Sequence, residues 1–417
     1  MDPQADGVPA DFPPISGRMR GSNQSGLRAH NERTVLSLIR QHGELAKAEI
    51  ARRTGLSAQT ASVIMRALEA EELVLRDMPR RGRVGQPSIP MRLNPSGAFA
   101  FGLKIGRRSV ELVLMDFLGV VRARERLTYA YPDVDLVLDF VREAQPRVAS
   151  AIEARLRLRI VGLGVAMPYE MWSWAEEIGA PAERMDAWRR IDIVAELVAI
   201  TSLPVNLAND ATAACAAENV FGNTTSLDYV YFFVGAFVGG GIVMGGDLVT
   251  GRTGNAGALG SMPVPRAARE GVAGVRLDGF EQLINFASIH VLEKMIAAEG
   301  GDPLVLWKDA GAWDQLGTVL DHWLGIAARG LAYAIVSASA IYDFECAVID
   351  GGFPENVRTR LVEATQRAMV RLRRQGLTPL DIRAGTMGAG AREIGSASLP
   401  FFARFLLDHR GLSAEAA

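Results

Sequence analysis

Cysteine, histidine and long apolar runs are all scarce in this sequence. Its 417 residues include only two cysteines, Cys215 and Cys346, and five histidines. The cysteines have neither metal-ligand spacing nor the number that a disulfide framework needs, which suits a reducing cytoplasm. No apolar run of about eighteen residues occurs, so we expect no membrane-spanning segment. The N-terminus has acids and prolines but no apolar stretch, so it lacks the pattern of a signal peptide.

What is present is a globular composition with unevenly distributed charge. Hydrophobic residues make up 49% and charged residues 22% of the chain, and its length predicts two or three domains. The formal net charge is −2, yet residues 1–95 have an excess of Lys and Arg, while residues 96–417 have an excess of Asp and Glu. A basic front part on an acidic body favours DNA contact at one end, although a solvated surface can have the same distribution.

Residues 28–95 have the pattern of a winged helix-turn-helix. The segment before them, residues 1–27, is rich in Pro, Gly, Ser and Asp and predicts a disordered arm. Apolar periodicity predicts helices at 31–43 and 48–54, and a third helix that Ser57 caps. The apolar face of the third helix would consist of Ala61, Ile64, Met65 and Leu68.

The third helix carries the residues that we expect to read DNA. A tight turn precedes it, and its first turns present short polar side chains, as recognition in the major groove requires. Gln can form two hydrogen bonds with adenine, and Ser and Thr can bond phosphates or base edges. The predicted contacts are Ser57, Gln59, Thr60, Ser62 and Arg66, with Arg52 and Arg53 at the phosphate backbone. The alternative is a plain three-helix bundle in which these polar residues are solvated and do not contact DNA.

A basic, glycine-punctuated turn between two short strands, 73–75 and 91–93, predicts the wing. Its Arg81 and Arg83 suit the minor groove, where narrow A·T tracts concentrate negative potential. Gln86 is a further candidate for a contact in the minor groove. The alternative is a solvated hairpin tip.

After Pro95 strands and helices alternate, which predicts layered α/β lobes. The turn after Gly106 is short, so we expect its two flanking strands to form a hairpin. Strands are expected at 99–106, 110–117, 159–167, 229–237, 241–246 and 346–352. Helices are expected at 133–158, 192–201, 209–221, 280–298, 315–340, 354–375 and 388–413.

From about residue 30 to 415 the chain resembles the transcription-factor branch of the ROK family (repressor, open reading frame, kinase). Besides the front module, the resemblance rests on four segments of the body, at 101–119, 203–222, 234–264 and 346–352. It implies an α/β fold, with the winged helix-turn-helix followed by a two-lobed actin-like (ribonuclease H-like) sugar-kinase fold. The implied first lobe is about 96–210 plus the C-terminal helix, about 388–417, and the second is about 211–387.

The resemblance also implies ATP and zinc sites whose residues have changed here. At the first phosphate loop Lys104 replaces an Asp and Arg108 a Thr, and the second loop contains Phe237 where bare glycine backbone is usual. The zinc ligands are missing, since residues 262–283 contain no Cys or His and Ser261 replaces a His. We therefore expect no catalytic residues, no metal and no cofactor. The family wing ends in Gly-Arg-Pro, where this chain has Gln86 before Pro87.

The implied sugar site is partly retained. Asn209 and Asp210 remain, Ala258 replaces a Glu, and we expect Asn255 and Glu281 to complete an effector site. The alternative is that Asn209 and Asp210 only cap the following helix.

Three cations and three aromatic side chains leave further alternatives open. Lys104, Arg107 and Arg108 could hold an anionic effector, although a solvated hairpin tip is favoured for the arginines. Tyr169, Trp172 and Trp174 could stack on a sugar, although core packing is the commoner role of such a cluster.

The sequence thus predicts a cytoplasmic regulator that represses carbohydrate-related genes. It would bind palindromic, A·T-rich operator DNA as a homodimer or homotetramer, under control of a small, carbohydrate-like effector. The alternatives are a sugar kinase with an added DNA-binding domain, and a DNA-binding protein whose effector pocket has decayed.

Overall fold

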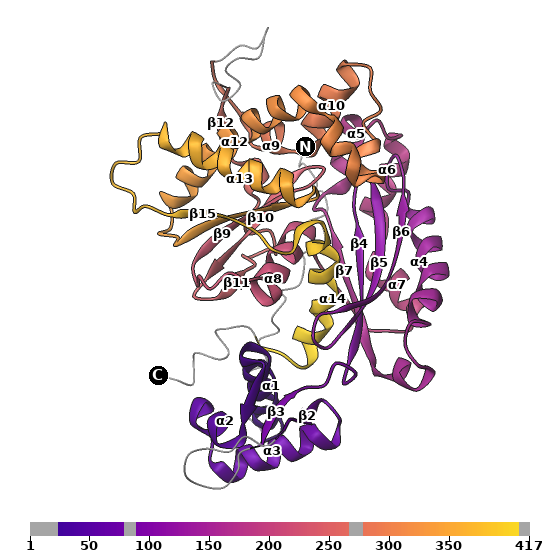
Figure 1. Ribbon diagram of the computed structural model, residues 1–417. Coiled ribbons are helices and arrows are strands. Elements are labelled where there is room, and N and C mark those ends of the chain that lie inside the picture. The colour runs from indigo at the N-terminus through magenta and orange to yellow at the C-terminus, as the bar shows by residue number, and fades with distance from the viewer. Residues whose placement is uncertain (1–23, 79–88, 267–277, 408–417) are drawn as a thin grey trace, which may run out of the picture.

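The computed structural model describes residues 24–78, 89–266 and 278–407 (Figure 1). The N-terminal module contains the helices α1 (Gln24–His42), α2 (Lys47–Thr54) and α3 (Ala58–Ala70). A small antiparallel sheet completes it, in the order β1 (Glu44–Ala46), β3 (Pro90–Leu93) and β2 (Val74–Arg76). This is a winged helix-turn-helix, as expected.

The helix α1 begins at Gln24, so the expectation of an arm through residue 27 was wrong for residues 24–27. Further along this helix, Arg28 and Glu32 form an i,i+4 ion pair of 2.8 Å. The third helix matches expectation: the Ser57 hydroxyl accepts from the Thr60 N–H at 3.1 Å, and the predicted apolar face is buried. Residues 1–23 and the wing turn, residues 79–88, lie outside the described residues.

The body contains two five-stranded sheets that repeat one topology (Figure 1). The first has the order β6 (Val121–Thr128), β5 (Ser109–Asp116), β4 (Phe99–Ile105), β7 (Ile160–Met167) and β8 (Val205–Asn209). The second has the order β11 (Asp247–Val249), β10 (Val238–Met244), β9 (Tyr229–Val234), β14 (Cys346–Gly351) and β15 (Asp381–Ala384). In both sheets the first three strands along the chain are antiparallel and the last two add in parallel.

Helices cover the outer face of each sheet. Those on the first sheet are α4 (Val134–Ala149), α6 (Ala182–Arg190) and α7 (Ile193–Thr201), with α5 (Ala175–Ile178) beside them. Those on the second are α9 (Ile284–Ala287), α10 (Ile289–Ala298), α11 (Val305–Lys308), α12 (Gly317–Ser339) and α13 (Glu355–Val370). A helix was expected over 280–298, but residues 280–282 form β13 (Phe280–Gln282), paired with β12 (Pro263–Pro265).

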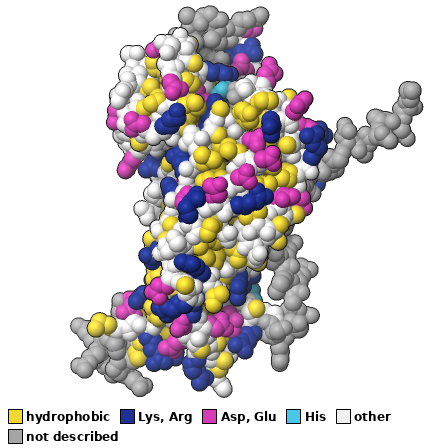
Figure 2. All heavy atoms as spheres, turned by 90° about the vertical axis from the view of Figure 1, so that its right-hand side faces the viewer, with side chains coloured by type: hydrophobic (Ala, Val, Ile, Leu, Met, Phe, Trp, Pro, Cys, Tyr) yellow, Lys and Arg dark blue, Asp and Glu magenta, His cyan; other side chains and the backbone are white. Residues whose placement is uncertain are grey.

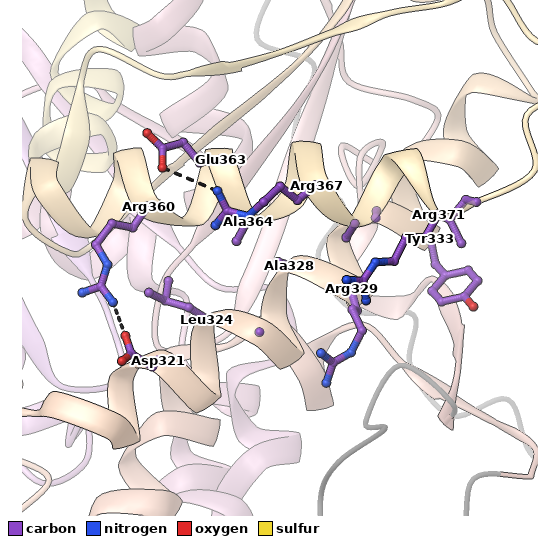
Figure 3. A pocket seen from close by; sticks show the side chains of 14 residues that line it. Asp321, Leu324, Ala328, Arg329, Tyr333, Arg360, Glu363, Ala364, Arg367 and Arg371 are labelled. Atoms are coloured by element: carbon purple, nitrogen blue, oxygen red, sulfur yellow. Dashed lines mark hydrogen bonds and ion pairs between the residues drawn. The ribbon is translucent and has the colours of Figure 1, made fainter.

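The helix α12 is long and apolar enough to cross a membrane by length and composition. Two thirds of its apolar window is buried, and side chains such as Trp323 and Leu331 belong to the core of the second lobe. It is therefore the central core helix of that lobe. Between α12 and α13 lies a groove of about 540 Å³ with an arginine-rich rim, whose Arg360 pairs with Asp321 (Figure 3).

Two helices fill the space between the sheets, namely α8 (Asp210–Phe221) and α14 (Ala391–Arg404). Side chains alternate between the two faces of β9, as expected for a strand. Tyr229, Tyr231 and Phe233 face α8, and Val230, Phe232 and Val234 face α12. On the first sheet, α14 lies close because Gly102 and Gly164 have no side chain: a Cβ at Gly164 would lie 1.7 Å from the Ser396 carbonyl oxygen.

Candidate DNA-binding and effector-binding sites

The exposed face of α3 is built from the side chains opposite its buried stripe. Gln59 and Arg66 are exposed, and Thr60 and Ser62 are half-buried. Ser57 and Thr60 share a hydrogen bond of 2.9 Å between their hydroxyl oxygens, so both also hold the helix start in place. The sequence argument missed Val63, which is 46% exposed on the same face, four residues after Gln59. In the sequence, the signal that could have identified Val63 was an apolar residue outside the apolar face of the predicted helix.

Arg52 and Arg53 of α2, which were predicted to contact the DNA phosphate backbone, form hydrogen bonds within the protein. Glu49 accepts from Arg52 and from Arg53, each at 2.6 Å, and the Arg53 guanidinium also lies 3.0 Å from the His42 ring. These hydrogen bonds lower the pKa of the Glu49 carboxyl. Figure 2 accordingly shows acidic side chains among the basic ones on this module. Arg81 and Arg83, like Gln86, lie outside the described residues.

Asn209 and Asp210 have different roles at the start of α8. The Asn209 side chain is the helix cap, since its Oδ1 accepts from the N–H groups of Ala211 and Thr212 at 3.0 and 3.3 Å. Asn209 thus has the capping role of the alternative, whereas the Asp210 carboxylate accepts from Arg392 of α14 at 3.2 Å. This pair joins positions 182 residues apart and is nearly buried.

The other two predicted effector residues lie on separate segments. Asn255 is half-buried in the loop that follows β11. Glu281 lies on β13, where its carboxylate accepts from Arg266 at 2.9 Å. The loop around Gly257 approaches β10 closely: a Cβ at Gly257 would lie 2.6 Å from the Cα of Gly241.

The position of the first phosphate loop, at the β4–β5 turn, is filled by contacts between the lobes. The Arg107 guanidinium stacks over the Phe237 ring at 3.8 Å, and Arg108 forms an ion pair of 3.2 Å with Glu293 of α10. Arg107 is 6% exposed. The expectation of a solvated hairpin tip was therefore wrong, because this turn faces the other lobe and not water.

Glu293 is the acidic centre of this contact. Its carboxylate also accepts from the Trp307 indole at 2.5 Å and lies 3.1 Å from a ring nitrogen of His290. Burial alone would raise the pKa of Glu293, but its hydrogen bonds from His290, Arg108 and Trp307 outweigh burial and lower the pKa to about 2. Glu293 is therefore ionised at neutral pH and holds Arg108 of the other lobe.

Neither an ATP phosphate group nor a structural zinc fits the residues at these positions. Lys104 is buried and donates to Glu111 at 3.0 Å and to Ser109 at 2.7 Å, so its ammonium group is held within its own sheet. The Phe237 ring and Arg107 take the space beside the second loop. Cys215 and Cys346 are buried in the other core of the second lobe, and no Cys or His occurs from Ser261 to Gln282, so the donor set of a zinc site is missing.

The three aromatic residues have only partly defined positions. Tyr169 and Trp172 pack against the core of the first lobe, in agreement with the structural alternative for this cluster. The side chain of Trp174 is not described.

A winged helix-turn-helix on a duplicated ribonuclease H-like body is a defined class of protein. A model of the ROK family matches residues 100–400, and a model of winged helix-turn-helix DNA-binding domains matches residues 28–74. The chain belongs to the ROK family. With its N-terminal DNA-binding domain it is a DNA-binding transcriptional regulator, as the sequence predicted.

Known relatives include both regulators and enzymes. The bifunctional enzyme NanE/NanK of Brucella suis is 34% identical over 47% of this chain and 34% of its own length. The xylose repressor of Bacillus subtilis is 21% identical over 58% of this chain and 62% of its own length. A crystal structure of a ROK family transcriptional regulator, a homolog of the E. coli MLC protein, has a TM-score of 0.65 at 19% identity, covering 93% of this chain and 98% of that one. The chain thus spans less than two thirds of the length of NanE/NanK and of the xylose repressor.

Proposed function

We propose that this regulator represses carbohydrate-related genes in the cytoplasm and that a carbohydrate-derived effector, bound near Asp210, releases it from DNA. The main support is the exposed α3 face, where Gln59, Val63 and Arg66 recur at helical spacing on a capped recognition helix. The likeness to a xylose repressor supports the carbohydrate class. Residues 28–95 would bind DNA, and the rest of the chain would sense the effector.

The proposed operator is palindromic and A·T-rich. Gln59 suits adenine, and the Val63 side chain suits the thymine methyl group beside it in the major groove. On DNA, Arg52 and Arg53 would release Glu49 and bind phosphate groups instead. Arg81 and Arg83 would enter the minor groove. Two half-sites need two modules, so a homodimer or homotetramer is the proposed assembly.

The protein is proposed to have no kinase activity. A catalytic base must accept a proton from the sugar hydroxyl, but Asp210 is held by the permanently charged Arg392 at 3.2 Å. The stretch of 34% identity to NanE/NanK is the observation that favours the rival function, a sugar kinase. Incubation with ATP and N-acetylmannosamine, glucose or xylose separates the two: we expect no sugar-dependent ADP release. ADP release that Asp210→Asn abolishes would establish the kinase instead.

The DNA assignment is tested with a site selected from random duplexes by the full-length protein. Gln59→Ala combined with Thr60→Ala should weaken binding to the selected site by about ten- to a hundredfold, since each base contact contributes roughly 1–3 kcal/mol. Binding to unrelated DNA should barely change. Equal losses on both DNAs would refute α3 as the recognition helix.

The effector assignment is tested with a panel of mono- and acidic sugars that are screened for a shift in melting temperature. We expect one class of sugar to stabilise the wild-type protein and to lower its DNA affinity. Asp210→Asn should remove both effects, so that the DNA affinity of the variant is the same with and without the sugar. A stabilising sugar that still acts on the variant would place the effector elsewhere.

A further inference from the structure

The two helices between the sheets both begin at the candidate effector site. The ion pair of Asp210 and Arg392 joins the first turn of α8 to the first turn of α14, with side chains 15% and 8% exposed. Nε of Arg392 is buried without a hydrogen-bond partner among the described residues, so the guanidinium has a donor that the pair does not use. The start of each helix is therefore tied to the start of the other.

Along their length the two helices are in close backbone contact. A Cβ at Gly395 would lie 1.9 Å from the Ala213 carbonyl oxygen, so only glycine allows this approach. At about 1.5 Å per residue, α8 is roughly 18 Å long and α14 roughly 21 Å. The two helices begin at Asp210 and Ala391 and run side by side towards the N-terminal module (Figure 1).

The far ends of both helices contact α1. Arg33 donates to the carbonyl oxygens of Phe402 and Leu406 at 2.7 and 3.0 Å, and the Ser37 hydroxyl accepts from the N–H of Leu407 at 2.8 Å. At the end of α8, the Arg40 guanidinium stacks on the Phe221 ring at 4.2 Å. One side of α1 thus rests on the ends of both helices.

The contact continues from α1 into the recognition helix. Leu36 and Ile39 of α1 share one buried apolar cluster with Ile64 and Met65 of α3. The same cluster includes Phe401 of α14. A close-packed cluster transmits a displacement because it has few voids to absorb one.

We infer that α8 and α14 transmit a change at Asp210 to the DNA-binding module, with Arg392 and Arg33 as positioning residues at the two ends. An effector hydroxyl that bonds Asp210 competes with Arg392 for the carboxylate. Loss of that bond frees α14 to shift, and α1 and α3 move with it. This inference rests on the proposed effector site.

A double-mutant cycle in the full-length protein tests the inference without any effector. The measured quantity is the Kd for the selected DNA, with Arg392→Gln, Arg33→Gln and the double variant. Each single change should weaken binding by about three- to tenfold, because mutations along such a contact path modulate coupling by roughly that much. The double variant should bind the selected DNA no more weakly than the single variant with the higher Kd. Effects that multiply would show independent sites and overturn the inference.

Three further measurements separate transmission from simple loss of stability. Arg360→Gln breaks an ion pair with Asp321 on the outer helices and should leave the DNA Kd unchanged. Arg392→Lys keeps a cation near Asp210 and should restore DNA binding to within about twofold of wild type. If Arg392→Gln weakens binding only in proportion to an unfolded fraction seen by circular dichroism, the inference is wrong. If the Gln59 and Thr60 changes do not affect specific binding, it is the DNA assignment that fails.

Discussion

At the scale of single residues, Glu393 is a buried acid whose surroundings shift its pKa. It is 1% exposed, and its Oε2 has no hydrogen-bond partner among the described residues. Burial raises its pKa to about 7, and the negative charge of Glu111 acts in the same direction. The charges of Lys104 and Arg124 act in the opposite direction. Arg124 lies 3.4 Å away but is 43% exposed, so water screens its effect. Burial therefore outweighs the ion pair.

This environment predicts a stability that falls as pH rises. The folded-state pKa lies above the ordinary value of 4.5, so the contribution of Glu393 is complete below about pH 4.5 and is lost as pH rises through 7. The isosteric Glu393→Gln should remove this decline and stabilise the protein at pH 8 by on the order of 2–3 kcal/mol. Urea unfolding at pH 5.5 and 8 measures it, with the exposed Glu125→Gln as control. A variant with the same pH slope as wild type would refute the assignment.

At the scale of elements, the α8–α14 contact depends on one missing side chain. Gly395→Ala would place a Cβ 1.9 Å from the Ala213 carbonyl oxygen, which backbone movement must relieve. Overpacking of this kind costs typically 1–3 kcal/mol, so we expect a melting temperature several degrees lower. Gly325→Ala is the matched control, because this helical glycine of α12 has its nearest neighbour, the flexible end of Arg329, at 3.6 Å. It should be neutral or slightly stabilising. Equal effects would argue against the close approach.

At the scale of the whole molecule, contacts between side chains hold the lobes together where the family's nucleotide would lie. Arg108 and Glu293 join the two lobes with side chains 13% and 4% exposed, and Arg107 stacks on Phe237 beside them. A charge buried without its partner is costly, typically 3–5 kcal/mol. The two lobes are therefore expected to be closed without a nucleotide.

This closure predicts where the molecule opens when the contact is broken. Arg108→Gln should destabilise the protein by on the order of 2–4 kcal/mol and increase amide hydrogen exchange at residues 235–238 and 289–293. The exposed pair of Arg147 and Glu125 lies within the first lobe, so Arg147→Gln should change stability by less than about 1 kcal/mol and leave exchange in these segments unaltered. Unchanged exchange in Arg108→Gln would show that other contacts hold the lobes.

Local pattern determined much of this protein. Periodicity and capping chemistry predicted α2, α3 and the Ser57 cap, and a short turn predicted the β4–β5 hairpin, because these features depend on residues a few positions apart. The changed phosphate loops and the missing zinc ligands were indicated by the resemblance to the ROK family and not by a local pattern. The sequence analysis did not predict β6, because charged side chains such as Arg124 occupy every second position of this strand.

The tertiary structure decided the partners of the charged residues. A turn rich in Arg has the same local pattern whether it faces water or another lobe, so only the fold could show that Arg107 and Arg108 are held by Phe237 and Glu293. Likewise, no local pattern could relate Asp210 to Arg392, 182 positions later, because that contact exists only when α14 inserts between the sheets. The sequence determined most of the local elements and which residues occupy the family's site positions, whereas long-range packing determined which charges meet.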